Sequence, residues 1–190
     1  MVDFFAMSVD QGSSNDDGGV MYTRLVVDAM LGSIARKLRV FGFDTLYYSG
    51  MEDSFLLDVC LNEARVLITM DEELHRRAER LGLRSILIGN NYSTSNKKSK
   101  DISIMETILR ALGVFYIEFN VNYSRCPLCN SSVEYVNDKY NLRGLIHNRI
   151  LDLYERFYIC KGCRKVYWEG SHVRRLKEFA KEVNARLVGV

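Results

Sequence analysis

The sequence has 190 residues, of which 47% are hydrophobic and 26% are charged, and its formal net charge is +2. This is the composition of a globular protein, and it excludes a chain that is disordered throughout. The length allows one domain, or one domain with a small module. No apolar stretch approaches the ~20 residues that a membrane helix needs, and the N-terminus lacks a secretion signal, so we expect a soluble cytoplasmic protein without a membrane partner.

The first 20 residues end in a run rich in glycine, serine and aspartate over residues 11–19, which is typical of a linker. We therefore expect a disordered leader over residues 1–20. For this segment we favour an extra tail, or a start codon assigned too early with Met21 as the true start, over a functional arm.

A continuous apolar run at residues 25–27 stops at Asp28, and Gly32 and a helical pattern follow. A short apolar run bounded in this way suits a strand that is buried on both faces, as in a parallel sheet. Asp28 would then lie at the carboxyl end of its strand, which is where open α/β sheets place their chemistry.

Strands and helices alternate after this first strand. Apolar runs predict further strands at residues 45–48, 65–69, 83–88 and 114–119, and helical spacing predicts helices near residues 31–41, 53–64, 72–81 and 102–112. Elements of these lengths in this order imply right-handed βαβ units. We therefore predict an α/β fold, with a mainly parallel sheet flanked by helices, over residues 21–121.

Two CxxC pairs follow, Cys126 with Cys129 and Cys160 with Cys163. Each pair presents two thiolates from one tight turn, and together they form an S₄ set that favours a structural Zn²⁺, with rubredoxin-like iron as the competitor. A basic helix closes the chain. We predict a zinc-ribbon module with this closing helix over residues 122–190, in which the metal supplies much of the folding free energy.

Three further residues with metal-binding side chains are expected to be non-ligands. Cys60 lies on the apolar face of a predicted helix and belongs to the core in this interpretation. His147 and His172 lie near the cysteines, but four thiolates already satisfy the ion. We expect His172 to pack beside Trp168.

Three acids lie where the predicted strands end or the helices begin. Asp28 and Asp71 each come just after an apolar run, and Asp53 lies at a helix start on the same edge. Carboxylates brought close together repel one another unless a cation lies between them, and oxygen ligands suit Mg²⁺ or Mn²⁺. Such an ion can position a phosphodiester and lower the pKa of an attacking water. The alternative for Asp53 and Asp71 is a structural role as helix caps, whereas nothing local asks for a charge at Asp28.

Several segments together resemble the Mut7-C ribonuclease domain family, which is described as a PIN-type nuclease domain followed by a zinc ribbon. They are residues 28–39 (DAMLGSIARKLR), 42–45 (GFDT), 65–71 (RVLITMD), 125–129 (RCPLC), 160–163 (CKGC) and 167–172 (YWEGSH). The resemblance extends from about residue 22 to about residue 175. It implies a PIN-like α/β domain and a metal-dependent ribonuclease activity.

The resemblance also implies roles for particular acids. By motif position Asp28, Asp53 and Asp71 match the first three acids of the family, and all three would bind the catalytic Mg²⁺ or Mn²⁺. Glu73 falls where PIN domains often carry a fourth acid. Glu52 could replace Asp53 if the loop shifts by one residue.

Substrate contacts are expected close to these acids. Thr69 matches the small hydroxyl residue beside the third acid, and Arg36 and Arg39 match basic residues of the family motif. Met70 stands where arginine is common in the family. Further candidates to line an RNA path are Lys37, Lys97, Lys98, Lys100, Arg174, Arg175, Lys177, Tyr123, Tyr135, Tyr140 and Trp168. For each of them the alternative is a solvated surface or a place in the ribbon core.

We therefore predict a metal-dependent endoribonuclease that hydrolyses phosphodiester bonds in single-stranded RNA, with the ribbon holding or orienting the RNA. The alternative is a non-catalytic RNA-binding or scaffold protein of the same fold. A receiver-type phosphoacceptor domain would need an acidic pair near the first strand's end and a lysine after the last strand, and neither is evident. The sequence leaves open whether the protein forms a homodimer, as many PIN domains do.

Overall fold

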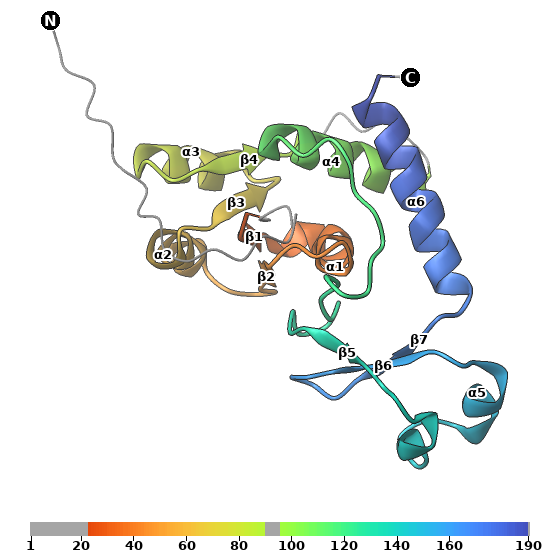
Figure 1. Cartoon of the computed structure of the whole chain (residues 1–190). Helices are drawn as coiled ribbons and strands as arrows, with labels where there is room; N and C mark the ends of the chain where they lie inside the picture. The colour runs from red at the N-terminus through yellow and green to blue at the C-terminus, as the bar shows by residue number, and fades with distance from the viewer. Residues whose placement is uncertain (1–22, 90–95, 190) are drawn as a thin grey trace, which may run out of the picture.

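The computed structural model describes residues 23–89 and 96–189 (Figure 1). The predicted leader over residues 1–20 lies outside the described residues, and so do residues 90–95. Within the described chain, no helix combines the length and the apolar character that crossing a membrane would require.

A four-stranded parallel sheet forms the centre of the first domain. Its strands are β1 (Leu25–Val27), β2 (Thr45–Tyr47), β3 (Val66–Thr69) and β4 (Ser85–Leu87), in the order β2-β1-β3-β4. All three pairings are parallel, so the prediction of a parallel sheet is confirmed. The three residues of β1 and the four of β3 are all buried, as expected for central strands with both faces covered.

Helices cover both faces of this sheet. The bounds are η1 (Ala29–Leu31), α1 (Gly32–Val40), α2 (Asp53–Glu63), α3 (Glu72–Arg80), α4 (Lys97–Leu112) and α6 (Ser171–Leu187). Side chains of β1 alternate between the two faces, with Leu25 and Val27 packed in the core beneath α1 and α4, and Val26 in the core beneath α2 and α3. Figure 1 shows the resulting layers, with α2 and α3 on one side of the sheet and α1 and α4 on the other.

The predicted strand at residues 114–119 is wrong, because this segment pairs with a side chain rather than with β4. Asn184 of α6 donates from Nδ2 to the carbonyl oxygen of Ile117 (2.8 Å), and its Oδ1 accepts the backbone N–H of Ile117 (3.0 Å). One amide thus satisfies both backbone groups of Ile117 as a neighbouring strand would. Apolar side chains of this segment are nevertheless packed inside the domain, since Ile117 is 1% exposed and Phe119 packs against the core.

The ribbon is a three-stranded antiparallel sheet with a small core of its own. Its strands are β5 (Val133–Tyr135), β6 (Phe157–Cys160) and β7 (Val166–Trp168), in the order β5-β6-β7, with η2 (Lys139–Leu142) and α5 (Asn148–Leu153) between β5 and β6. The core consists of Leu142, Leu151, Phe157, Ile159 and Val166. A core this small suits a module that depends on a metal for part of its stability.

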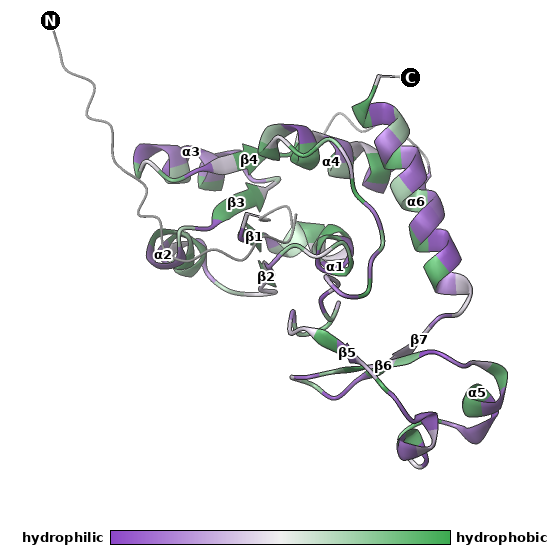
Figure 2. Ribbon diagram, in the orientation of Figure 1, coloured by the Kyte–Doolittle hydropathy of each residue, from purple (hydrophilic) through white to green (hydrophobic). Residues whose placement is uncertain are grey.

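The closing helix α6 packs on the first domain, although the sequence analysis grouped it with the ribbon. Phe179, Ala180, Val183 and Leu187 join the core that contains β1 and α4. Figure 2 shows hydrophilic and hydrophobic residues alternating along α6, which is the pattern of a helix with one buried side. The chain therefore leaves the α/β domain, forms the ribbon and returns to complete the first core.

Candidate functional site

The first candidate site lies at the carboxyl ends of β1 and β3. These strands are neighbours, but the chain leaves β1 for β2 on one side and leaves β3 for β4 on the other. Such a switch in direction is where open α/β sheets bind ligands. Asp28 follows β1 directly, and Asp71 follows β3 after one intervening residue.

Thr69 connects these two acids by hydrogen bonds. Its hydroxyl donates to Oδ2 of Asp28 (2.9 Å), and it accepts the backbone N–H of Asp71 (2.9 Å). The N–H of Asp28 donates in turn to the carbonyl oxygen of Ile68 on β3 (3.0 Å). Because Thr69 is fully buried, its hydroxyl has a fixed position and holds the carboxylate of Asp28 beside the start of the Asp71 turn.

Asp71 is also the N-cap of α3, which is the structural role that the sequence analysis gave as the alternative for this residue. Its Oδ1 accepts the backbone N–H groups of Glu73 (2.7 Å) and Leu74 (3.0 Å). The cap uses one carboxylate oxygen and leaves Oδ2 outside it. The side chain is exposed, so a cap and a ligand role are compatible at this residue.

Asp53 and Glu73 have basic partners on α3. Oδ2 of Asp53 lies 3.1 Å from Nη1 of Arg77, and Glu73 forms ion pairs with Arg76 (3.4 Å) and Arg80 (3.9 Å). Asp53 is the first residue of α2 and not its cap, since the N-cap position belongs to Glu52. The structure thus joins Asp28 and Asp71 through Thr69, and it directs Asp53 and Glu73 toward arginines.

One residue of this edge was missed in the sequence analysis. Tyr47 ends β2 as the register partner of Val27, and its hydroxyl donates to the carbonyl oxygen of Ala29 (3.1 Å). Its ring lies against the start of α1, where a Cβ on Gly32 would come within 2.7 Å of the tyrosine oxygen. Gly32 permits this close approach, because any larger residue there would clash with the tyrosine ring.

The second candidate site is formed by the two cysteine pairs. The sulfur atoms of Cys126, Cys129, Cys160 and Cys163 all lie within 4.8 Å of one another, and no other group of three or more ligand-type side chains within residues 23–89 and 96–189 meets that criterion. Two sulfur–sulfur distances are 3.6 Å (Cys126 to Cys163) and 3.3 Å (Cys129 to Cys160). Sulfurs in a tetrahedron with Zn–S bonds of about 2.3 Å lie about 3.8 Å apart. The four cysteines are therefore compatible with a structural zinc ion.

The backbone around the sulfurs has a repeated form. Asn130 (φ 68°) and Arg164 (φ 59°) each follow the second cysteine of a pair in the left-handed region. Their N–H groups bond to the carbonyl oxygens of Cys126 (2.9 Å) and Cys160 (3.1 Å). Each knuckle is thus closed by its own backbone, which holds the two cysteines of the pair on one tight turn.

The family model described as the Mut7-C RNAse domain matches residues 23–180. The chain belongs to this family. The match includes the α/β domain, the ribbon and the first half of α6, and the family description suggests a nuclease-like function with RNA as the substrate. Searches of curated proteins and of solved structures gave no significant match.

In this Mut7-C chain the two predicted RNA-contacting arginines have different surroundings. Arg36 is exposed on α1. Arg39 is only 5% exposed, and it donates from Nε to the carbonyl oxygen of Thr45 (2.8 Å) and from Nη1 to those of Pro127 and Leu128 (3.0 Å each). Burial lowers the pKa of its guanidinium. Its Nη1 donor joins the α/β domain to the ribbon, so Arg39 has a docking role in this structure, and its predicted RNA contact stays a prediction.

Asn130 adds a second connection between the Mut7-C ribbon and the sheet. Its Nδ2 donates to Oδ1 of Asp44 (2.7 Å), and its Oδ1 accepts the N–H of Thr45 at the start of β2 (3.1 Å). Asp44 is also paired with Arg65 (2.9 Å), and hydrogen bonds from Arg65 and Asn130 lower the pKa of its carboxyl against the opposing effect of burial. The first cysteine knuckle is thereby attached to β2, next to the strand that carries Asp28.

The local environment gives two of the cysteine thiols different acidities. A hydrogen bond from Ser131 lowers the pKa of Cys129 to about 6, whereas burial raises that of Cys160 to about 12. Cys126 Sγ also lies 3.0 Å from the hydroxyl oxygen of Tyr167. Cysteines bind a metal ion as thiolates, so the lowered pKa of Cys129 favours binding and the raised pKa of Cys160 opposes it.

The three residues predicted to be non-ligands lie outside the sulfur cluster. Cys60 is 1% exposed in the core beneath α2, and burial raises its pKa to about 11. His172 meets the ring of Trp168 edge-on at 6.3 Å. The Nδ1 of His147 accepts the N–H of Arg149 at the start of α5 (3.2 Å). None of the three belongs to the sulfur cluster.

Proposed function

We propose that this protein is a metal-dependent endoribonuclease of PIN-like type that hydrolyses single-stranded RNA. Membership in the Mut7-C RNAse domain family supports the substrate class. The observation that carries the reaction type is the Asp28–Thr69–Asp71 arrangement at the switch point of the parallel sheet. Two carboxylates held at that place are what a hydrolytic divalent ion requires.

In this proposal Asp28 and Asp71 are the principal ligands of Mg²⁺ or Mn²⁺. When bound there, such an ion lowers the pKa of an attacking water and offsets charge on the leaving oxygen of the phosphodiester. Thr69 orients Asp28 by donating to one of its oxygens, which leaves the other free for binding. The helix N-terminus that Asp71 caps adds a positive dipole beside the position of the phosphate.

Asp53 and Glu73 are proposed as further acids of the same site. Their ion pairs with Arg77 and Arg76 are largely solvent-exposed, and exposed pairs contribute at most about 1 kcal/mol. A bound divalent cation competes well against an arginine held that weakly. The arginines would then be free to contact the RNA backbone near the cleaved bond.

The four cysteines would hold Zn²⁺ as a structural ion, since all four positions are protein ligands. The ribbon would present RNA to the α/β domain, to which it is attached through Arg39 and Asn130. Cysteine pairs of this type suit a reducing compartment, and we propose the cytoplasm as the site of action.

Cleavage of a labelled single-stranded RNA tests the proposal. Purified protein is assayed with Mn²⁺, with Mg²⁺ and with EDTA, alongside Asp28→Asn and the control Asp58→Asn, which changes an exposed acid elsewhere on α2. We expect activity only with added metal, a loss of at least about 100-fold for Asp28→Asn and no loss for Asp58→Asn. Equal activity of Asp28→Asn and the wild type would contradict the assignment of Asp28 as a catalytic metal ligand.

One observation favours the alternative of an RNA-binding protein without turnover. Within the described residues no three carboxylates come together as the cysteines do, because Asp53 and Glu73 are directed to arginines. The same assay separates the two functions. RNA affinity without cleavage under any metal condition would establish the alternative.

A further inference from the structure

An exposed aromatic segment lies beside the basic helix α6, away from the elements that carry the acids. Phe115 and Tyr116 are each 64% exposed and Tyr123 is 57% exposed. Large apolar side chains gathered in this way on a surface mark an interaction site. All three line one open cavity of about 680 Å³, together with Asn120, Asn122 and Arg125 among others.

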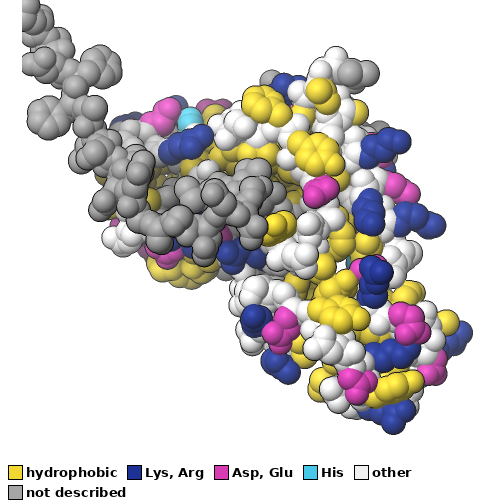
Figure 3. Space-filling view, in the orientation of Figure 1, with side chains coloured by type: hydrophobic (Ala, Val, Ile, Leu, Met, Phe, Trp, Pro, Cys, Tyr) yellow, Lys and Arg dark blue, Asp and Glu magenta, His cyan; other side chains and the backbone are white. Residues whose placement is uncertain are grey.

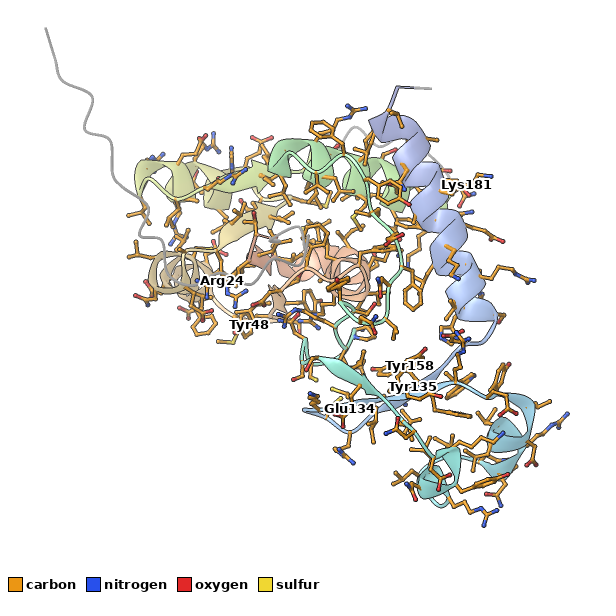
Figure 4. All side chains as sticks on the ribbon, in the orientation of Figure 1. Arg24, Tyr48, Glu134, Tyr135, Tyr158 and Lys181 are labelled. Atoms are coloured by element: carbon orange, nitrogen blue, oxygen red, sulfur yellow. The ribbon has the colours of Figure 1, made fainter. Side chains whose placement is uncertain are left out.

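A second cavity continues from the first along α6. It has a volume of about 480 Å³, shares Tyr116 and Glu118 with the first, and is lined on its other side by Lys177 and Lys181. Lys181 extends from α6 in Figure 4, and Figure 3 shows dark blue side chains following that helix with large yellow side chains close by. The two cavities thus form one groove, which we call the aromatic–lysine groove, with rings at one end and ammonium groups at the other.

The lysines of the groove carry charge that the described chain does not neutralise. Lys177 and Lys181 are exposed, and neither forms an ion pair with any described residue, whereas Lys98 and Arg174 are paired with Glu182 and Glu178. Two unpaired ammonium groups beside three exposed rings are complementary to a polyanion with unpaired bases. That is the chemistry of a single-stranded nucleic acid, whose phosphates follow the cations while its bases stack on the rings.

The backbone under the rings is fixed before any ligand binds. Gly113 ends α4 in the left-handed region (φ 73°), and Ile117 is buried with both backbone groups held by Asn184. Phe115 and Tyr116 therefore project from a segment that is fastened to α6 on one side and to the core on the other. A preorganised platform binds more tightly because less order is lost on association.

We propose that the aromatic–lysine groove is a second RNA-binding site, which holds a single-stranded segment of the substrate apart from the acids that would cleave it. The proposal rests on the proposed function for the choice of RNA as the nucleic acid. Glu118 is the one acid that lines the groove, and it opposes binding. Replacing Glu118 should therefore strengthen RNA binding, whereas replacing a lysine of the groove should weaken it.

The test measures RNA affinity without cleavage. The zinc-loaded Asp28→Asn protein is titrated against a fluorescent oligouridylate in Mg²⁺ buffer, and anisotropy is followed at several salt concentrations. Further substitutions are then added in that background. We expect Phe115→Ala and Tyr116→Ala each to weaken binding about 5- to 150-fold, which is the cost of losing one stacked base.

Charge variants give independent readouts. Lys177→Ala and Lys181→Ala should each weaken binding and lower the slope of log K against log salt by about 0.7. Glu118→Gln should strengthen binding. Matched controls are Leu61→Ala, an apolar side chain on α2 that is 62% exposed and lines neither cavity, and Lys165→Ala, an exposed lysine of the second knuckle. Both should leave the affinity unchanged.

Three outcomes would overturn the proposal. One is that the ring variants bind RNA as tightly as the Asp28→Asn parent while remaining folded by their melting temperature. Another is that duplex RNA binds equally well and with equal sensitivity, since its bases cannot stack on the rings. A third is that the RNA-free protein self-associates through Phe115 and Tyr116, which would make the groove a contact between copies. A negative cleavage assay would contradict the proposed ribonuclease activity but not these binding measurements. The two proposals can therefore be tested independently.

Discussion

Replacing Arg39 with alanine tests whether the buried guanidinium joins the ribbon to the α/β domain. The side chain is 5% exposed and donates to three carbonyl oxygens, those of Thr45, Pro127 and Leu128. Its removal leaves these oxygens without their partner, and a buried group without a partner costs about 1–3 kcal/mol. Water can reach part of the opened space, so we expect a total loss of about 3–5 kcal/mol in the free energy of unfolding.

Thermal unfolding of the zinc-loaded protein measures this loss. For a chain of this length 1 kcal/mol shifts Tm by roughly 2–4 °C, so Arg39→Ala should lower Tm by roughly 6–20 °C. Arg36→Ala is the matched control on the same helix, because Arg36 is exposed and its loss should change stability by no more than about 0.5 kcal/mol. Arg39→Lys keeps the charge but lacks the planar fork, and it should fall between the two.

Hydrogen exchange gives the local readout. The N–H of Thr45 donates to Oδ1 of Asn130, and the N–H of Arg125 donates to the carbonyl oxygen of Arg39. Both amides should exchange faster in Arg39→Ala if the ribbon separates from the domain. An unchanged Tm together with unchanged protection of both amides would refute the docking role.

Three further changes follow from the same contacts. Removal of zinc by a chelator should expose the amides of β5–β7 to exchange while those of β1 and β3 stay protected, because the ribbon core is small and the sheet core is separate; equal protection with and without metal would contradict this. Thr69→Val, which keeps the shape but removes the hydroxyl, should cut RNA cleavage about 10- to 100-fold by releasing Asp28 and Asp71, whereas Thr69→Ser should retain activity. Arg77→Ala should change stability by at most about 1 kcal/mol and should raise Mn²⁺ affinity if Asp53 is a ligand; an unchanged affinity would leave Asp53 with a structural role.

The parallel sheet and the two cysteine pairs could be predicted because each depends on a local pattern. The run at residues 25–27 is apolar at every position, and in the structure all three residues of β1 are buried. The CxxC spacing brings two sulfurs together within one turn, and all four sulfurs do meet. In both cases the residues that decide the outcome are neighbours in the sequence.

The contacts of α6 and Arg39 could not be predicted in this way. The segment at residues 114–119 has the apolar pattern of a strand, and only the distant side chain of Asn184 decides that it does not join the sheet. Arg39 stands in a basic helix beside exposed Arg36, and its burial depends on two carbonyl groups almost ninety residues further on. Long-range hydrogen bonds of single side chains leave no periodic signal in a sequence.

Binding of Mn²⁺ tests the central claim most directly, because it asks whether Asp28 and Asp71 hold one ion between them. The free ion is followed by its paramagnetic resonance during titration of the zinc-loaded protein, of Asp28→Asn, of Asp71→Asn and of the control Asp58→Asn. We expect one site in the wild type and in Asp58→Asn, and a clear loss of affinity in each of the other two variants. Equal Mn²⁺ affinity in all four proteins would contradict the account.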